Sequence, residues 1–219
     1  MTSYNKFDTS VINLEKIQDK KFSIPTYQRP YVWKELQITK LLKDCSVSFL
    51  NNPDDSYFIG TVLTSDKTTY SELIDGQQRF TTLWLIAVVF HKLKIESSIV
   101  NYLKVGKELR LGFEIRKEVE HYFELLEKHP EDAIKKYSEE ELNKQLYLKD
   151  IAKAVTTIEG ILLSLENDSK QKLDLKEFGD FLYKKVLMIN NVTPKNIDLN
   201  KLFATINNSG IQLEQTDIV

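Results

Sequence analysis

Polar and charged side chains form a short run between two apolar segments in YSELIDGQQRFTTLWLIAVVF, residues 70–90. Arg79 in this run offers a planar guanidinium fork that matches phosphate oxygens. Asp75 repels phosphate, so it suits a magnesium ligand, a partner that orients Arg79, or a base for a water molecule. An arginine and a carboxylate at this spacing therefore suit phosphate chemistry.

The neighbours of this pair suit the rest of a nucleotide. Gly76 permits a tight turn and the close approach of a ligand to the backbone. Gln77 and Gln78 can donate and accept hydrogen bonds at once, so they suit a sugar, a base edge or an attacking water. Thr81 and Thr82 offer hydroxyl groups to phosphate or to a metal. The whole set predicts a nucleotide phosphate site.

A simpler interpretation of the same run needs no ligand. Asp-Gly is a common turn, and Arg79 can pair with Asp75 while both glutamines face water. The apolar segments on both sides of the run favour a site over this interpretation, because they place the polar side chains against a core.

A second segment, IPTYQRPYVW, places Gln28 and Arg29 between Pro25 and Pro30. Its aromatic side chains allow two interpretations. In the first, the segment is an edge strand or a loop whose rings pack on the core, since proline suits these positions better than a central strand. In the second, Arg29 is a second arginine brought to the same anion, and the rings form a surface for a base.

The elements around Asp75 must place this run at the end of a sheet. Residues 57–65 and 69–74 are expected to form strands, and a helix is expected from about residue 78 to 93. A strand that leads through Gly76 into a helix leaves the first backbone N–H groups of the helix without partners. Those groups and the positive end of the helix dipole favour an anion.

Helical periodicity predicts three further amphipathic helices, over residues 34–50, 113–128 and 138–165. The last of these begins with Ser138 and Glu141 at the spacing of a capping box. The residues expected on the buried sides are Ile38, Leu41, Leu42, Cys45, Phe49, Ile115, Val119, Tyr122, Phe123, Leu126, Ile151, Val155, Ile158, Leu162 and Leu165.

The C-terminal part is expected to return from helix to strand and back. Asp174 suits the cap of a short helix, and residues 185–193 are the one later strand candidate. Asp198 suits the cap of another helix, which ends at the turn signal of residues 207–210. The final LEQTDIV reads as the first turn of a further helix, so we expect a piece of a longer protein.

We therefore expect an α+β protein with a small mixed β-sheet flanked by helices and followed by a mainly helical subdomain. Residues 1–95 are expected to form the mixed domain that carries the site. Residues 96–184 form the helical subdomain. Residues 185–219 form a strand-helix return segment that packs on the first domain and is truncated at its C-terminus.

Composition excludes several classes of protein. The 219 residues include 30 Lys and Arg against 32 Asp and Glu, which argues against a protein that coats nucleic acid by charge alone. Cys45 is the single cysteine, so an internal disulfide framework is excluded. We see neither a signal-peptide core nor an apolar run long enough to span a bilayer. We expect a soluble, cytoplasmic protein without membrane association.

Four motifs, taken in their order along the chain, resemble one known family. They are IPTYQRPYVW, YFIGTVL, LIDGQQRFTTL and LFATINNSGIQLEQTDIV. Together they resemble the N-terminal domains of GmrSD-type restriction endonucleases, whose fold looks related to the ParB and sulfiredoxin nucleotide-binding fold. The resemblance covers the chain nearly end to end, and DGQQR is its most specific motif. Residues 113–187 match only in general character.

The resemblance implies a nucleotide-dependent component of bacterial defence that restricts modified phage DNA. The resemblance also implies that the domain binds an NTP (ATP, GTP or CTP) with Mg²⁺. In several members the domain is expected to hydrolyse it. The implied partners are DNA and an HNH-type nuclease domain in the full-length chain or in a separate subunit, with a homo-oligomer left open. The implied catalytic residues are Asp75, Gln78 and Arg79, with Asp75 also the metal ligand. The implied nucleotide-binding residues are Gln28, Arg29, Gly76, Gln77, Thr81, Thr82, Asn207 and Gly210.

Two departures limit what the resemblance transfers. His91, His121 and His129 are scattered and form no HNH signature, so the nuclease module is expected outside this chain. Sulfiredoxin chemistry needs a cysteine in the phosphate motif, where this chain has Gln77 and Gln78.

Two alternatives stay open beside an NTP-hydrolysing regulatory domain. The first is a non-catalytic, ParB-like DNA-binding or partner-docking module, with Lys34, Lys40 and Lys43 along one face. The second, weaker alternative is that the chain itself cuts DNA with a metal held at Asp75. Few further carboxylates stand near the motif in the sequence, which counts against it.

Overall fold

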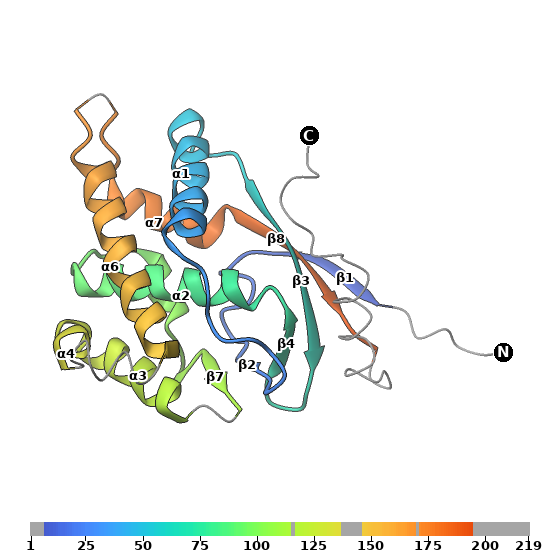
Figure 1. Ribbon diagram of the computed structural model, residues 1–219. Helices are drawn as coiled ribbons and strands as arrows, with labels where there is room; N and C mark the ends of the chain where they lie inside the picture. Colours follow the sequence, from blue (N-terminus) through green and yellow to red (C-terminus); the bar gives the residue numbers. More distant parts are fainter. Residues whose placement is uncertain (1–6, 115–116, 137–145, 170, 195–219) are drawn as a thin grey trace.

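The computed structural model describes residues 7–114, 117–136, 146–169 and 171–194 (Figure 1). Its larger sheet has six strands in the order β1-β8-β3-β4-β2-β7. A separate two-stranded sheet pairs two short strands, β5 and β6. The strand bounds are β1 (Asp8–Ile12), β2 (Phe22–Ile24), β3 (Tyr57–Asp66), β4 (Ser71–Asp75), β5 (Lys104–Val105), β6 (Glu108–Leu109), β7 (Leu111–Phe113) and β8 (Val186–Val192).

The large sheet is mixed, as the sequence predicts. Strand β4 runs parallel to β2 and antiparallel to β3, while β3 runs parallel to β8. Strand β7 is parallel to β2, and β1 is antiparallel to β8. The edge-strand interpretation of the IPTYQRPYVW segment is wrong for β2, because β2 lies between β4 and β7. The loop alternative is confirmed for residues 25–34, which lie outside the sheet. Pro25 and Pro30 follow the end of β2, so they remove no hydrogen bond from the sheet.

The described helices confirm the periodicity of the sequence, except that the helix predicted from residue 113 begins at Lys117, because Phe113 belongs to strand β7. In Figure 1, helices α1, α2, α6 and α7 lie on one side of the sheet. Asp174 caps α7 by accepting a hydrogen bond from the backbone N–H of Glu177, as predicted. Among the described helices, none is long and apolar enough to cross a membrane. The helix bounds are α1 (Glu35–Asn51), α2 (Gln77–Lys92), η1 (Ser98–Tyr102, a 3-10 helix), α3 (Lys117–Lys128), α4 (Pro130–Lys136), α6 (Leu146–Glu166) and α7 (Leu175–Lys184).

Some predicted features lie outside the described residues. They are Ile115, the capping box at Ser138 and Glu141, and the helix and turn expected between Asp198 and Gly210. Cys45 is buried in the core, as expected from its place on the apolar side of α1. His91 is exposed in the last turn of α2.

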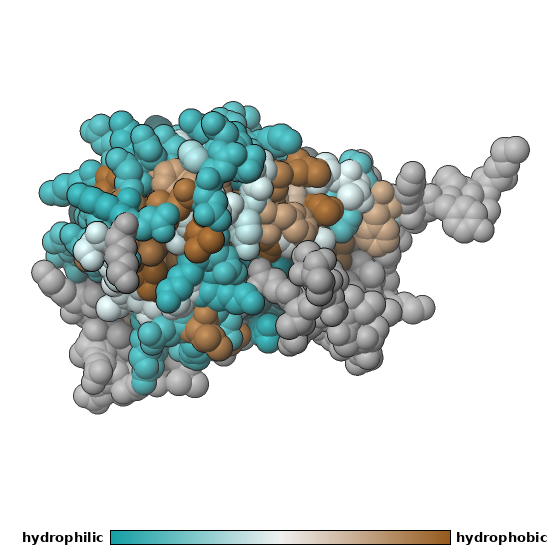
Figure 2. Space-filling view, turned by 90° about the horizontal axis from the view of Figure 1, so that it is seen from above, coloured by the Kyte–Doolittle hydropathy of each residue, from teal (hydrophilic) through white to brown (hydrophobic). Residues whose placement is uncertain are grey.

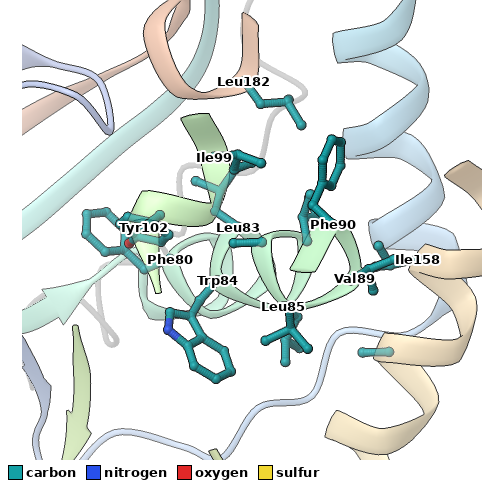
Figure 3. Packing of buried hydrophobic residues seen from close by; sticks show 14 of the residues in the cluster. Phe80, Leu83, Trp84, Leu85, Val89, Phe90, Ile99, Tyr102, Ile158 and Leu182 are labelled. Carbon is teal, nitrogen blue, oxygen red and sulfur yellow. The ribbon is translucent and has the colours of Figure 1, made fainter. Parts of the chain in front are cut away.

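Helix α2 forms the centre of the core. Every residue from Phe80 to Phe90 is buried, and their side chains leave the helix in all directions (Figure 3). A helix without a polar side must be covered all round, here by the sheet and by the surrounding helices. Trp84 is 0% exposed and stacks on Phe123 of α3, with ring centroids 4.2 Å apart. One apolar cluster therefore joins residues 1–95 to residues 96–184, and the boundary between them stays a prediction.

A buried arginine ties together two loops beside this core. Arg110 is 1% exposed, and the carbonyl groups of six residues accept hydrogen bonds from its guanidinium. These carbonyls belong to Ile17, Gln18, Lys20, Asn101, Tyr102 and Lys104. The Tyr102 ring lies 5.1 Å from the guanidinium carbon. The charge is thus solvated by backbone dipoles in place of water.

Outside this core, polar and apolar side chains are intermixed on the surface. Seen from above, the molecule presents hydrophilic side chains with brown, apolar patches among them (Figure 2). Exposed large hydrophobic residues include Val11 of β1, Leu36 and Val47 of α1, Phe58 of β3 and Leu163 of α6.

The central position of α2 gives a direct stability test. Leu85→Ala removes a fully buried side chain and should lower the free energy of unfolding by about 2–5 kcal/mol. Leu163→Ala is the matched control, because Leu163 is 37% exposed and its loss should change stability by about 0.5 kcal/mol or less. Urea unfolding followed by circular dichroism measures both. Equal losses would contradict the central role of α2.

Candidate functional site

The sheet brings the two motifs together although they are far apart in the sequence. Because β2 and β4 are parallel neighbours, the segments that follow them leave the sheet at the same end of the strands. Strand β2 continues into residues 25–34, and β4 continues through Gly76 into α2. The side chain of Gln28 donates a hydrogen bond to the carbonyl of Ile74, which joins the first motif to the end of β4.

Two glutamine side chains at the start of α2 hold the backbone of the first motif. The amide nitrogen of Gln77 donates to the carbonyl of Arg29 at 2.7 Å. Gln78 donates to the carbonyl of Pro30 at 3.0 Å and accepts from the N–H of Val32 at 2.9 Å. Both glutamines are buried, at 5% and 7% exposure. The structure therefore uses these amides to fix a loop.

A hydroxyl pair adds to this contact one helical turn further on. Thr82 is fully buried and donates to the carbonyl of Gln78 at 2.8 Å. The Tyr31 hydroxyl lies 2.9 Å from the Thr82 hydroxyl. Burial raises the pKa of Tyr31, and the hydrogen bond with Thr82 opposes that shift. Thr81 is also buried, so both predicted threonines lie inside the protein.

Arg79 contacts a different neighbour, the strand β3. Its guanidinium donates to the carbonyls of Ile59 and Thr61 on either side of Gly60. Its Nε atom is buried and has no hydrogen-bond partner among the described residues. Burial lowers the pKa of Arg79, and the nearby negative charge of Asp75 opposes that shift. The guanidinium still carries its charge at neutral pH, because an arginine pKa starts so high.

Two glycines make these contacts possible. Gly60 has φ +112, and a Cβ atom there would lie 2.6 Å from Nη1 of Arg79. Gly76 has φ +90 at the N-cap of α2, and a Cβ atom there would lie 2.5 Å from Val62. Both backbone conformations favour glycine, and both positions lack room for a side chain. No side chain caps the N-terminus of α2, so its first N–H groups keep their capacity to bind an acceptor.

Of the remaining predicted residues, two are exposed and two lie outside the described part of the chain. The side chains of Asp75 and Arg29 are exposed. Asn207 and Gly210 lie outside the described residues. Arg79 contacts β3 while Gln77 contacts the backbone of Arg29, so the two arginines adjoin different neighbours of α2. Among the described residues, no hydrogen bond links the two side chains to a common group, and their common anion site stays a prediction.

A metal at this position would need ligands beyond those that the described residues supply. The described residues contain no group of three or more His, Cys, Asp or Glu side chains that could hold a metal ion. Mg²⁺ is commonly held by one or two carboxylates together with substrate phosphates and water. The exposed carboxylate of Asp75 fits that kind of shared site. Three cavities of about 490, 480 and 410 Å³ lie elsewhere, since residues 75–82 line none of these three.

Sequence reasoning missed the part that β3 plays in the site. Gly60 belongs to the YFIGTVL motif, and a glycine inside a strand pattern signals a bulge or the close approach of another group. The pairing register of β3 with β8 shifts between Phe58 and Thr61, which surrounds this glycine. That signal was available, but the sequence does not name Arg79 as the group that approaches.

The fold and these contacts define an α+β domain. Its candidate site lies where a buried helix starts at the C-terminal end of an inner strand of a mixed sheet. The family model of the GmrSD restriction endonuclease N-terminal domain matches residues 10–219, so the chain belongs to this family. By family, therefore, it is part of a restriction endonuclease system. Comparison with curated proteins gave no match.

The glutamine contacts predict a loss of stability when one of them is removed. Gln78→Ala leaves the N–H of Val32 and the carbonyl of Pro30 without their partner, which should cost about 1–3 kcal/mol of unfolding free energy. Limited proteolysis should also cut residues 25–34 faster. Gln171→Ala is the control, because that side chain is exposed. Unchanged unfolding and unchanged cleavage would contradict this role of Gln78.

The contact between Gly60 and Arg79 predicts non-additive effects. Gly60→Ala forces an alanine into φ +112 and against the guanidinium, which should cost about 1–3 kcal/mol. Combined with Arg79→Ala, the loss should be smaller than the sum of the two single losses, by about 0.5 kcal/mol or more. Gly160→Ala is the control, because a Cβ atom there meets nothing within 4 Å. Strictly additive losses would show that the contact carries no energy.

Proposed function

We propose that this chain is a nucleotide-binding regulatory domain that licenses DNA cleavage in a GmrSD-like restriction system. It binds an NTP with Mg²⁺, and an HNH-type nuclease domain or subunit cuts the DNA. The observation that carries this proposal is the start of α2, which no side chain caps and which lies beside the guanidinium of Arg79 and the exposed carboxylate of Asp75. A phosphate oxygen is the acceptor that both a guanidinium and free helix N–H groups bind well.

The contacts support different tasks for the predicted residues. Asp75 is exposed beside Arg79, where it would hold Mg²⁺ shared with the phosphates. The metal would neutralise phosphate charge and orient the leaving group. Gln77 and Gln78 act by positioning the backbone of Arg29 and its neighbours. Gln78 would orient an attacking water only after releasing Val32 or Pro30, so in this proposal its main task is structural.

The proposed substrate is DNA, modified phage DNA included, and membership of a restriction endonuclease family supports DNA as the substrate. The nuclease partner and self-association are part of the same proposal. The proposal also includes hydrolysis of the nucleotide by Asp75 and Arg79. Hydrolysis requires a catalytic step in addition to binding.

Nucleotide binding is testable with variants of the two exposed residues. Thermal-shift titrations with ATP, GTP, CTP and UTP, each with and without Mg²⁺, should show stabilisation by at least one nucleotide. Arg29→Ala should weaken that nucleotide by about tenfold or more, as expected for a lost charge-assisted contact. Asp75→Asn should remove the dependence on Mg²⁺. Both side chains are exposed, so neither variant should unfold the domain.

Lys176→Ala, an exposed cation on α7, is the matched control and should bind like the wild type. Arg79→Ala is a poor first variant, because Arg79 also holds the carbonyls of β3. Absence of any nucleotide effect on the wild type, or an unchanged affinity in Arg29→Ala, would overturn the proposal.

A second candidate function is supported by the internal use of the motif side chains. Gln77, Gln78 and Thr82 are all buried and hydrogen-bonded to protein groups. This is expected of a domain that keeps the family's fold but does not hydrolyse the nucleotide. Nucleotide binding without phosphate release would favour this non-catalytic module. DNA affinity that falls steeply with salt would add a DNA-binding role.

A further inference from the structure

A cavity of about 480 Å³ lies between the start of α1 and helix α6, away from residues 75–82. Its wall includes Trp33, the last residue of the first motif, and Lys34, the N-cap of α1. A cavity of this size lies within the range of small-molecule sites in proteins. The proposed nucleotide site at the start of α2 does not account for it, because residues 75–82 do not line it.

The wall of the cavity suits a flat ring. Trp33 is half-buried, so part of its indole remains available for contact. Ile38 and Ala152 are buried apolar residues that also line the cavity. Aromatic faces favour other aromatic rings in stacked or edge-on geometry, with a gain beyond simple burial.

The rim of the cavity suits a negative charge. Three lysines and two carboxylates line the cavity, and one of these carboxylates, Asp150, already pairs with Lys34. Lys149 and Lys153 stand one helical turn apart on α6, so they reach the same side of the cavity. In the described part of the chain, Lys153 is exposed and forms no ion pair.

We propose that this cavity is a binding site for a small molecule that combines a planar aromatic ring with an anionic group. The ring stacks on Trp33, and the anion pairs with Lys153. The site is connected to the first motif, because Trp33 follows directly on Val32, whose N–H is held by Gln78. A ligand here touches both α6 and the segment that carries Arg29, so its binding should order that segment.

Tryptophan fluorescence reports on this cavity selectively. The chain has two tryptophans, and Trp84 is 0% exposed inside the core. Quenching by contact therefore reports on Trp33. The probe is 4-nitrobenzoate, a planar anion that quenches indole, and the matched neutral probe is 4-nitrobenzamide. We expect saturable quenching by 4-nitrobenzoate and a dissociation constant about tenfold weaker for 4-nitrobenzamide.

Variants locate the contact. Lys153→Glu should weaken 4-nitrobenzoate by about tenfold or more, while Lys176→Glu on α7 should bind normally. Calorimetry on Trp33→Ala, which lacks the reporter, should show lost binding. Hydrogen exchange of the amides at residues 29–34 should slow on binding in the wild type and not in Lys153→Glu.

The proposal is independent of nucleotide binding at Asp75. Asp75→Asn should therefore bind 4-nitrobenzoate like the wild type, whatever its response to Mg²⁺ and nucleotide. Linear, non-saturable quenching, or equal affinity in Lys153→Glu and the wild type, would overturn it.

Discussion

The candidate site depends on the hydrogen bonds that two buried glutamines make to a loop backbone. A loop packed against a core must pair its N–H and carbonyl groups, because burying them unpaired is costly. Gln77 and Gln78 supply both donors and an acceptor, which fixes the carbonyls of Arg29 and Pro30 and the N–H of Val32. The exposed arginine, the indole that follows it and the start of α1 all take their positions from this arrangement.

On its other side, the start of α2 is fitted to β3 with equally little freedom. Arg79 spans the carbonyls around Gly60, and Gly76 lies against Val62. The helix that begins there is buried on every side, so it cannot shift to accommodate a ligand. Any adjustment on binding must therefore come from the exposed side chains or from the loop. This restriction is what a preorganised anion site requires.

Much of the site's scaffold was predictable from the sequence. The strand, the Asp75–Gly76 turn and the apolar helix follow from periodicity and from glycine's backbone freedom, and all three are confirmed. The inner position of β2 was not predictable, since a three-residue strand followed at once by Pro25 looks like an edge. The glutamines show the deeper limit. An amide beside a core can bind a ligand or a backbone equally well, and only the path of a distant loop decides which.

The solvation of Arg110 by backbone carbonyls has a consequence for how the molecule responds to acid. Its acceptors are carbonyl oxygens, which are not protonated in mild acid. The Arg110 guanidinium keeps its positive charge at every pH at which proteins fold. The contacts that hold residues 17–20 to residues 101–104 are therefore independent of pH.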